Sequence, residues 1–229
     1  MIERLINLLF PRRAVCMGCG SMLGCERDDI CDECRERLAG SWVGVERPDK
    51  AMRLDGAAYA YRYHGVAGNL VRRLKYGSVG VLAEEMGIDL ARAALQLRID
   101  NLDMIVPVPM HPRRQRQRGY NQSILLAEAA AKRLGVDSVD ALMRTRDAVQ
   151  QVKLDDEQRR RNLEGVFAVR PEFADRVRGG CILLVDDVRT TGTTAKECAA
   201  ALREAGAGKV YFAAYAAAKS GENRRKKNG

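Results

Sequence analysis

Residues 181–194 read CILLVDDVRTTGTT and combine an apolar run, an acidic pair and a threonine-rich turn. The apolar run, 182–185, is typical of a strand that is covered on both faces of a parallel sheet. Asp186 and Asp187 follow at the carboxyl end of that strand, where open α/β sheets bind ligands. A helix is predicted over 193–205, so a strand, an acidic pair and a helix start meet at one edge of the sheet.

The turn between this strand and this helix is rich in hydroxyl groups. Gly192 allows close approach of a ligand, and Thr190, Thr191, Thr193 and Thr194 surround it. Backbone N–H groups at a helix N-terminus bind phosphate, so the turn predicts a phosphate cradle. The carboxylate pair just before it can accept hydrogen bonds from vicinal hydroxyls, which favours a ribose 5-phosphate. In the alternative interpretation these residues only cap a turn and a helix, but caps require one Asp or Thr rather than two acids and four threonines.

Segment 183–194 resembles the phosphoribosyl pyrophosphate (PRPP) motif of the type I phosphoribosyltransferases. Apolar strands and helices also alternate along the chain, and this pattern predicts a parallel α/β sheet with helices on both faces. Arg189 departs from the motif, because this position is usually apolar or aromatic in the family. It places a charge near the site that the sequence does not explain.

The composition bounds the size and the partners of the protein. At 229 residues the chain has room for one main domain and a small extra module. Lys and Arg number 39 against 30 for Asp and Glu, and the net charge of +9 favours partners that carry phosphate groups. No apolar run reaches the roughly 18 residues of a membrane-spanning helix. The amphipathic start, 1–10, predicts a short helix docked on the body, or else a partner-binding or membrane-surface helix, rather than a signal peptide.

Two CxxC pairs lie near the N-terminus, Cys16 with Cys19 and Cys31 with Cys34. Four thiolates at this spacing predict a closed tetrahedral zinc site, and the metal then supplies the folding free energy of a segment with little apolar content. An iron–sulfur cluster on the same four ligands is the alternative. Cys25 lies between the pairs and is interpreted as a bystander. Reduced thiols, some of them on metal, indicate a cytoplasmic protein.

The rest of the pattern divides the chain into a zinc module over 1–50, a phosphoribosyltransferase-like domain over 51–220 and a disordered basic tail over 221–229. We expect a linker over 40–50, a strand over 55–63 with three tyrosines on one face, helices over 65–75, 79–98 and 121–134, and strands over 104–109, 166–169 and 210–216. The polar stretch 144–165 predicts a mobile loop followed by a short basic helix.

An arginine-rich segment follows the strand over 104–109. It contains Arg113, Arg114, Arg116 and Arg118, which form a concentrated anion site if they gather at the end of a parallel strand. The alternative is a solvated basic face. His111 begins the segment beside prolines, which favours a role in a turn over a catalytic role.

Several short motifs appear in the order that is typical of the ComF family. They are the zinc knuckles, Leu74-Lys75-Tyr76, Val106-Pro107-Val108-Pro109, Arg118-Gly119-Tyr120-Asn121-Gln122, Arg161-Asn162-Leu163 and the PRPP motif. The chain resembles this family over roughly residues 14 to 219. The resemblance implies a cytoplasmic bacterial protein with a zinc-finger-like N-terminus on a phosphoribosyltransferase domain, linked to natural competence and the use of imported DNA.

The resemblance also implies roles for the site residues. Asp186 and Asp187 hold the ribose diol, while residues 190–194 bind the 5-phosphate. Lys75 faces the pyrophosphate together with Pro109, Arg113 and Arg114. The reaction is displacement of pyrophosphate from C1 of the ribose, with Mg²⁺ bridging the diol and the pyrophosphate and with segment 144–165 as a lid that excludes water. The acceptor cannot be read from the sequence.

A second interpretation is a non-catalytic adaptor of the DNA-uptake machinery that keeps PRPP binding as a regulatory input. The net charge, the arginine-rich segment and the basic tail suit phosphate backbones. Aromatic residues make up only 5% of the chain, and single strands are usually held by stacking on such residues. We therefore expect weak, salt-dependent binding to single-stranded DNA, or a protein partner such as an uptake helicase.

Overall fold

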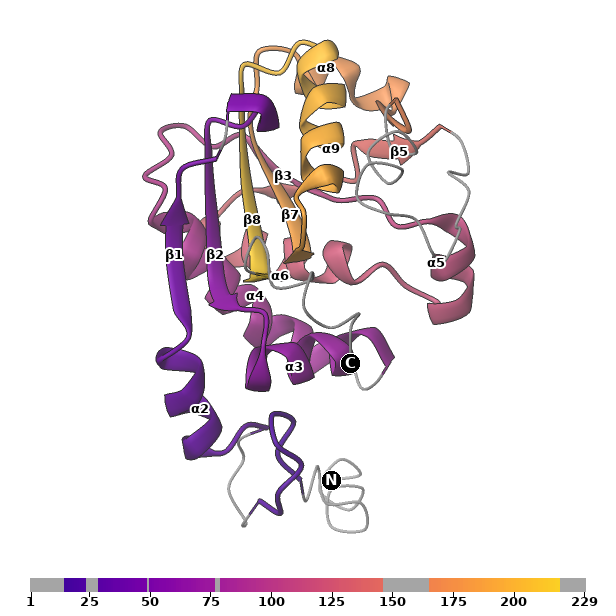
Figure 1. The fold of residues 1–229 in the computed structure, drawn as a ribbon. Coiled ribbons are helices and arrows are strands. Elements are labelled where there is room, and N and C mark those ends of the chain that lie inside the picture. Colours follow the sequence, from indigo (N-terminus) through magenta and orange to yellow (C-terminus); the bar gives the residue numbers. More distant parts are fainter. Residues whose placement is uncertain (1–14, 24–28, 49, 77–78, 146–164, 219–229) are drawn as a thin grey trace, which may run out of the picture.

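The computed structural model describes residues 15–23, 29–48, 50–76, 79–145 and 165–218. Its centre is a six-stranded sheet with the order β1-β2-β8-β7-β3-β4, drawn as arrows in Figure 1. The strands are β1 (Trp42–Glu46), β2 (Gly56–Arg62), β3 (Met104–Pro107), β4 (Asp137–Ser138), β7 (Cys181–Arg189) and β8 (Lys209–Ala217). Only β1 is antiparallel to its neighbour, and the other pairs are parallel. The predicted α/β class with a mostly parallel sheet is confirmed.

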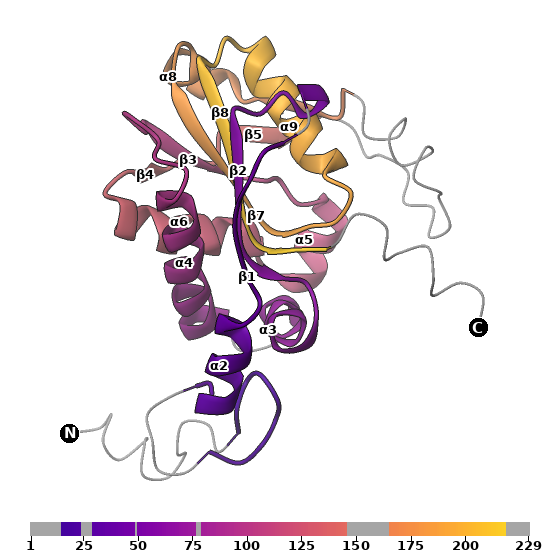
Figure 2. The same ribbon diagram turned by 60° about the vertical axis from the view of Figure 1, so that its left-hand side comes forward.

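Helices cover both faces of this sheet, as predicted (Figure 2). One core contains side chains of α3 (Gly65–Tyr76), α4 (Val79–Leu95) and α6 (Gln122–Leu134). The other contains side chains of α9 (Thr193–Glu204) and of a small second sheet, β5 (Leu142–Arg144) with β6 (Phe167–Val169). Short elements complete the described chain: α2 (Asp32–Ala39), α5 (Pro112–Arg118), α8 (Ala174–Val177), η1 (Lys50–Met52) and η2 (Pro171–Phe173).

The strand β7 runs through the middle of both cores. Ile182, Leu183, Leu184 and Val185 are each 0% exposed. Leu183 and Val185 belong to the core under α4 and α6, whereas Ile182 and Leu184 belong to the core under α9. Burial of each such side chain contributes about 1.5–3 kcal/mol relative to exposure, so this strand fixes where both helix layers sit.

The boundaries of α6 show how local sequence sets an element. The side chain of Asn121 accepts a hydrogen bond from the backbone N–H of Ser123 and caps the start of the helix. At the other end Gly135 adopts a left-handed φ of 70°, and its N–H bonds the carbonyl of Ala131. Both ends match the predicted helix.

Two sequence predictions are wrong in the first strands. The stretch 40–50 is not a plain linker, because β1 lies inside it and pairs Trp42 with Tyr61 at the edge of the main sheet. The tyrosines of β2 do not share one face: Tyr59 joins the core under α9, and Tyr61 joins the core under α4. Both differences depend on contacts that are remote in sequence.

Several other predictions lie outside the described residues, namely the N-terminal helix over 1–10, the role of Cys25, most of the loop over 144–165 and the tail over 221–229. The division of the chain at residue 50 stays a prediction. Among the helices that the structure describes, none is both long enough and apolar enough to span a membrane.

Candidate functional site

The candidate site lies where β3 and β7 end. Val185 pairs with Pro107, and the N–H of Val108 donates to the Val185 carbonyl at 2.9 Å. Asp186 and Asp187 therefore emerge just beyond the last pairing of the two strands. Figure 1 shows the carboxyl ends of β7 and β8 directed toward α3, whose last turn carries Lys75.

Asp187 forms an ion pair with Lys75. The Lys75 Nζ lies 2.7 Å from Asp187 Oδ2, and the two side chains are only 23% and 6% exposed. The contact lacks hydrogen-bond geometry, and no group in the described part of the chain donates a hydrogen bond to this buried oxygen. A buried acceptor that is left without a donor is costly, so Asp187 Oδ2 is suited to a ligand that brings a hydroxyl group.

Asp186 is held in a different way. Its Oδ1 accepts hydrogen bonds from the Ser123 hydroxyl and from the backbone N–H of Asp187, each at 2.8 Å. Burial and the neighbouring Asp187 charge raise the pKa of Asp186 to about 7, although these two donors and Lys75 act in the opposite direction. The pair of carboxylates thus carries a charge repulsion that a ligand hydroxyl or a cation would relieve.

The threonine turn begins α9. Gly192 is the N-cap, with a left-handed φ of 80°, and a Cβ at this position would lie 2.8 Å from Met52 Cε. The hydroxyls of Thr191 and Thr193 are 3.0 Å apart. The first N–H groups of a helix have no partner within the helix, and the macrodipole favours an anion there. A phosphate group therefore fits this turn, whose left-handed position favours glycine.

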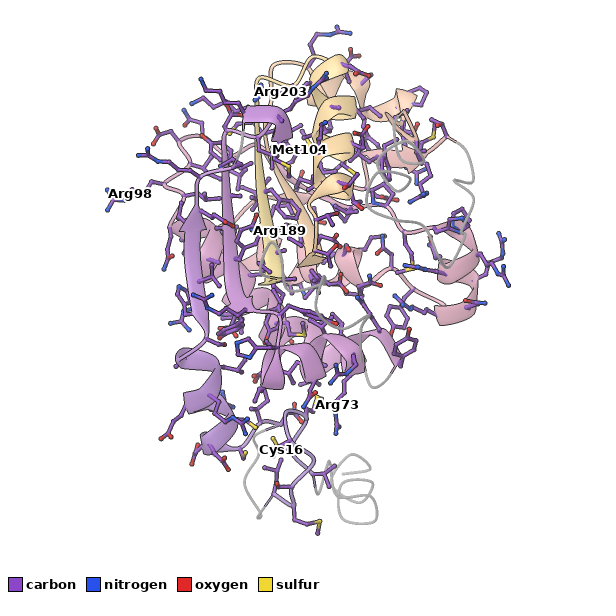
Figure 3. The ribbon with its side chains drawn as sticks, in the orientation of Figure 1. Cys16, Arg73, Arg98, Met104, Arg189 and Arg203 are labelled. Atoms are coloured by element: carbon purple, nitrogen blue, oxygen red, sulfur yellow. The ribbon has the colours of Figure 1, made fainter. Side chains whose placement is uncertain are left out.

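Arg189 has a structural explanation that the sequence did not supply. Its guanidinium forms an ion pair with Glu46 of β1 and lies 4.7 Å from the centre of the Tyr59 ring. Figure 3 labels Arg189 on the ribbon beside β2 and β8. The side chain thus ties the end of β7 to the antiparallel edge of the sheet.

The four cysteines of the CxxC pairs come together. All four Sγ atoms of Cys16, Cys19, Cys31 and Cys34 lie within 4.8 Å of one another. Backbone N–H groups of Gly18 and Cys31 each donate to Cys16 Sγ at 3.3 Å. Burial of Cys16 opposes its ionisation, but these N–H donors prevail and lower its pKa to about 6. Such a group can bind a metal ion such as zinc.

The backbone around this cluster leaves no spare room. A Cβ on Gly18 would lie 2.8 Å from Cys34 Sγ and 2.9 Å from Val66 of α3. Asn69, also on α3, donates a hydrogen bond to the Gly18 carbonyl at 2.6 Å. In Figure 3, Arg73 extends from α3 on the side of Cys16. The cysteine cluster is therefore packed directly on the helix that carries Lys75.

No family model matches the chain. DNA utilization protein YhgH of Escherichia coli O157:H7 is 35% identical over 146 residues, which cover 62% of this chain and 63% of that protein. Competence protein ComFC of Bacillus subtilis is 28% identical over 211 residues, which cover 89% of this chain and 83% of that protein. The chain is similar to these two proteins, and its match to the first spans less than two thirds of that relative's length.

Among the solved structures, one that the chain matches in part is the glutamine PRPP amidotransferase of Bacillus subtilis in complex with ADP and GMP. It is 20% identical, matches with a TM-score of 0.42, and the match covers 62% of this chain and 30% of that chain.

The structure brings together some of the residues predicted for the site. Lys75, Asp186 and Asp187 are in contact or adjacent, and residues 190–194 follow directly on β7. Pro109 is buried beside the end of β3, whereas Arg113 and Arg114 are exposed on α5. Their parts in ligand binding stay predictions.

His111 has the turn role that the sequence predicted. Its Nδ1 accepts a hydrogen bond from the backbone N–H of Arg113 at 3.1 Å, so it caps the start of α5. Arg118, at the end of α5, donates to Gln122 Oε1 at 2.9 Å. The arginine-rich segment is thus a short capped helix.

The sequence analysis missed the residues that surround the charged pair. Tyr120, Asn121 and Ser123 each bond a different part of the site: the end of α3, the loop after β3 and Asp186. The available signal was the motif at 118–122, which served only to support the family resemblance. Nothing in its spacing says which backbone or side-chain groups it contacts.

Proposed function

We propose that the chain binds PRPP together with Mg²⁺ at the edge formed by β7 and α9. One observation carries the proposal: in β7, shortly before a glycine-capped helix N-terminus, Asp186 adjoins Asp187, whose buried Oδ2 accepts no hydrogen bond from the described residues. The carboxylates suit vicinal hydroxyls, and the helix start suits a phosphate group. A ribose 5-phosphate carries both the vicinal hydroxyls and the phosphate group that these two parts of the site suit.

Each part of the site then has a role. Asp186 and Asp187 accept hydrogen bonds from the 2- and 3-hydroxyls of the ribose, while the backbone N–H groups and hydroxyls of residues 190–194 bind the 5-phosphate. Lys75 lies beside the diol position through its ion pair with Asp187, so its ammonium group is available to the pyrophosphate on C1. Pro109, Arg113 and Arg114 complete the pyrophosphate side.

The residues present fit a magnesium–PRPP complex. The site offers carboxylate oxygens at Asp186 and Asp187, and a hard divalent cation prefers such ligands. Mg²⁺ would be held chiefly by oxygens of PRPP itself, next to these carboxylates. When bound, it neutralises the charge of the departing pyrophosphate.

The reaction we propose is transfer of the phosphoribosyl group to an acceptor. The bond between C1 and pyrophosphate breaks as the acceptor attacks C1, and the ribose develops positive charge. The two carboxylates stabilise that charge, and Lys75 stabilises the negative charge on the leaving group. The chain is thereby a pentosyltransferase, with the acceptor to be identified.

The Cys16, Cys19, Cys31 and Cys34 cluster holds one structural zinc in this proposal. Its four thiolates close the coordination shell, so the metal has no open position for chemistry. Its part is to fold the segment that packs on α3. We place the protein in the cytoplasm, where thiols stay reduced.

A second candidate function is an adaptor in the use of imported DNA, as the names of the relatives suggest. One observation favours it: Tyr76 is 79% exposed, and the Arg118 guanidinium lies 5.1 Å from the centre of its ring. An exposed aromatic ring with an arginine can hold a nucleobase of single-stranded DNA. The partner in this role is single-stranded DNA or an uptake helicase.

Calorimetry with PRPP and Mg²⁺ tests the first function, and pyrophosphate release with a panel of nucleobases and amines tests the transfer. We expect binding in the micromolar to millimolar range that requires Mg²⁺. A wild-type protein without heat of binding at millimolar PRPP contradicts the proposal. Titration with single-stranded DNA at two salt concentrations, with Tyr76→Ala beside wild type, tests the second function.

A further inference from the structure

The segment between α5 and α6 contacts the helix that carries Lys75. The hydroxyl of Tyr120 donates a hydrogen bond to the carbonyl oxygen of Leu74 at 2.6 Å. That carbonyl belongs to the last turn of α3, where the final four carbonyls have no donor within the helix. Tyr120 supplies a donor, and it fixes the backbone immediately before Lys75.

The first turn of α6, which follows this segment directly, holds the first carboxylate. Ser123 is 1% exposed, and its hydroxyl donates to Asp186 Oδ1 at 2.8 Å. The backbone N–H of Asp187 donates to the same oxygen, so two donors fix Oδ1. A buried hydroxyl is costly without a partner, and an alanine would suit this core position equally well for packing alone. The hydroxyl therefore serves the carboxylate.

Hydrogen bonds of Asn121 anchor the segment to its neighbours. Asn121 is 5% exposed; its side chain accepts from the Ser123 N–H at 3.0 Å and donates to the Val108 carbonyl at 3.0 Å. It thereby caps α6 and holds the loop after β3 at the same time. Tyr120 and Ser123 are thus presented from a backbone that is anchored to the main sheet.

We infer that Tyr120 and Ser123 are positioning residues of the PRPP site. Tyr120 sets the place of Lys75 through the last turn of α3, and Ser123 orients the carboxylate of Asp186. The inference rests on the proposed PRPP binding and extends it to residues that do not touch the ligand. Small displacements of such groups matter, because charged partners act on a ligand only within a narrow geometry.

The Tyr120→Phe variant keeps the ring and removes only the hydroxyl. Loss of one hydrogen bond should weaken PRPP binding about five-fold in the wild-type background. If Tyr120 acts through Lys75, the same change should cost nothing further in a Lys75→Met background. An equal loss in both backgrounds overturns this role. Tyr211→Phe, near the start of β8 and remote from the site, is the matched control and should leave affinity unchanged.

For Ser123, the variants Ser123→Ala and Ser123→Thr separate the hydroxyl from packing. We expect about five-fold weaker PRPP binding for Ser123→Ala and near wild-type binding for Ser123→Thr, which restores the donor. Equal affinity of both variants and wild type overturns the role, as does a Ser123→Thr protein that melts like wild type and binds like Ser123→Ala. Ser138→Ala on the edge strand β4 controls for loss of a serine elsewhere.

Hydrogen–deuterium exchange separates this inference from the proposed function, since it needs no ligand. Tyr120→Phe should increase exchange at the last amides of α3, whose turn loses its external donor. Unchanged exchange there overturns the positioning of Lys75 even if wild type binds PRPP. Faster exchange in a protein that does not bind PRPP supports the contact and contradicts only the ligand.

Discussion

Lys75 Nζ and Asp187 Oδ2 lie 2.7 Å apart, and this contact joins the end of α3 to the end of β7. The two residues are far apart in sequence and come from opposite sides of the candidate site. The ammonium group lies beside a buried carboxylate oxygen that accepts no hydrogen bond from the described part of the chain. In the proposed PRPP complex, a ribose hydroxyl would donate a hydrogen bond to Asp187 Oδ2.

Removing the cation should destabilise the protein as well as weaken PRPP binding. Lys75→Met leaves the Asp187 charge buried without its partner. Loss of one partner of a buried pair costs about 3–5 kcal/mol. Because Lys75 is partly exposed, we expect the free energy of unfolding to fall by about 1–3 kcal/mol, and urea unfolding measures this loss. Lys209→Met, an exposed position at the start of β8, is the control. Adding Asp187→Asn to Lys75→Met should recover part of the loss; no recovery would mean that the ion pair is not the cause.

The second prediction concerns Asp186 and pH. Burial and the Asp187 charge raise the pKa of Asp186 to about 7, above its ordinary value of 3.8. The folded protein therefore binds more protons than the unfolded chain between these values, so this group makes the free energy of unfolding fall as pH rises from about 4 to about 7. Asp186→Asn keeps an acceptor for Ser123 and removes the charge.

We expect Asp186→Asn to stabilise the protein at pH 8 by on the order of 2 kcal/mol, less than full linkage because the side chain is partly exposed. The same variant should bind PRPP at least about ten-fold more weakly, since a neutral amide is a poorer acceptor for two hydroxyls. Urea unfolding from pH 5 to pH 8 and calorimetry measure both effects. A variant that is less stable than wild type at pH 8 would show that the carboxylate pair is not under repulsion.

Sequence reasoning located the site because its elements are local. The strand, the acidic pair and the threonine turn are consecutive, so 181–194 alone predicts a ligand edge, and the period of the apolar residues predicts α3, α4 and α6. The CxxC spacing likewise predicted the cysteine cluster, since each pair forms within one turn. Structural features that depend on residues within about ten positions of one another could therefore be predicted from the sequence.

The rest depends on contacts between distant segments. Glu46 explains the charge of Arg189, but it lies in a stretch predicted as a linker, and no periodicity indicates that β1 would pair at the sheet edge. Tyr120 meets a backbone carbonyl, which leaves no trace in composition. Pattern reasoning therefore picked out Lys75, Asp186 and Asp187, which the structure brings together, and missed the side chains that contact them or the adjoining backbone.

The third prediction concerns the phosphate cradle. Gly192→Ala places a Cβ 2.8 Å from Met52 Cε and forces a left-handed φ on an L-residue, so α9 should start differently. We expect a loss of about 1–2 kcal/mol in stability, from strain at a left-handed position, and strongly reduced PRPP affinity. Gly80→Ala, in α4 with open space around it, should not weaken either property.

Adding Met52→Ala to Gly192→Ala separates the two causes. It relieves the contact with the new Cβ but leaves the backbone strain, so we expect only partial recovery. Full recovery of PRPP affinity would mean that the side-chain contact alone matters and that the left-handed turn is not needed for the phosphate.

The last prediction is one zinc ion per chain on Cys16, Cys19, Cys31 and Cys34. Metal analysis of the purified protein should give this ratio, and Cys31→Ser should lose the metal, whereas Cys25→Ser should keep it. Gly18→Ala offers a test that leaves every ligand in place: its Cβ would lie 2.8 Å from Cys34 Sγ, so it should weaken zinc binding by disturbing the cluster. Because Cys16 and Cys34 are buried in the core together with Val66 and Leu70, metal loss should also lower the melting temperature. A Cys31→Ser protein that retains zinc while Cys25→Ser loses it would overturn the ligand assignment. A Gly18→Ala protein with full zinc content and an unchanged melting temperature would show that the close contact with Cys34 does not limit the cluster.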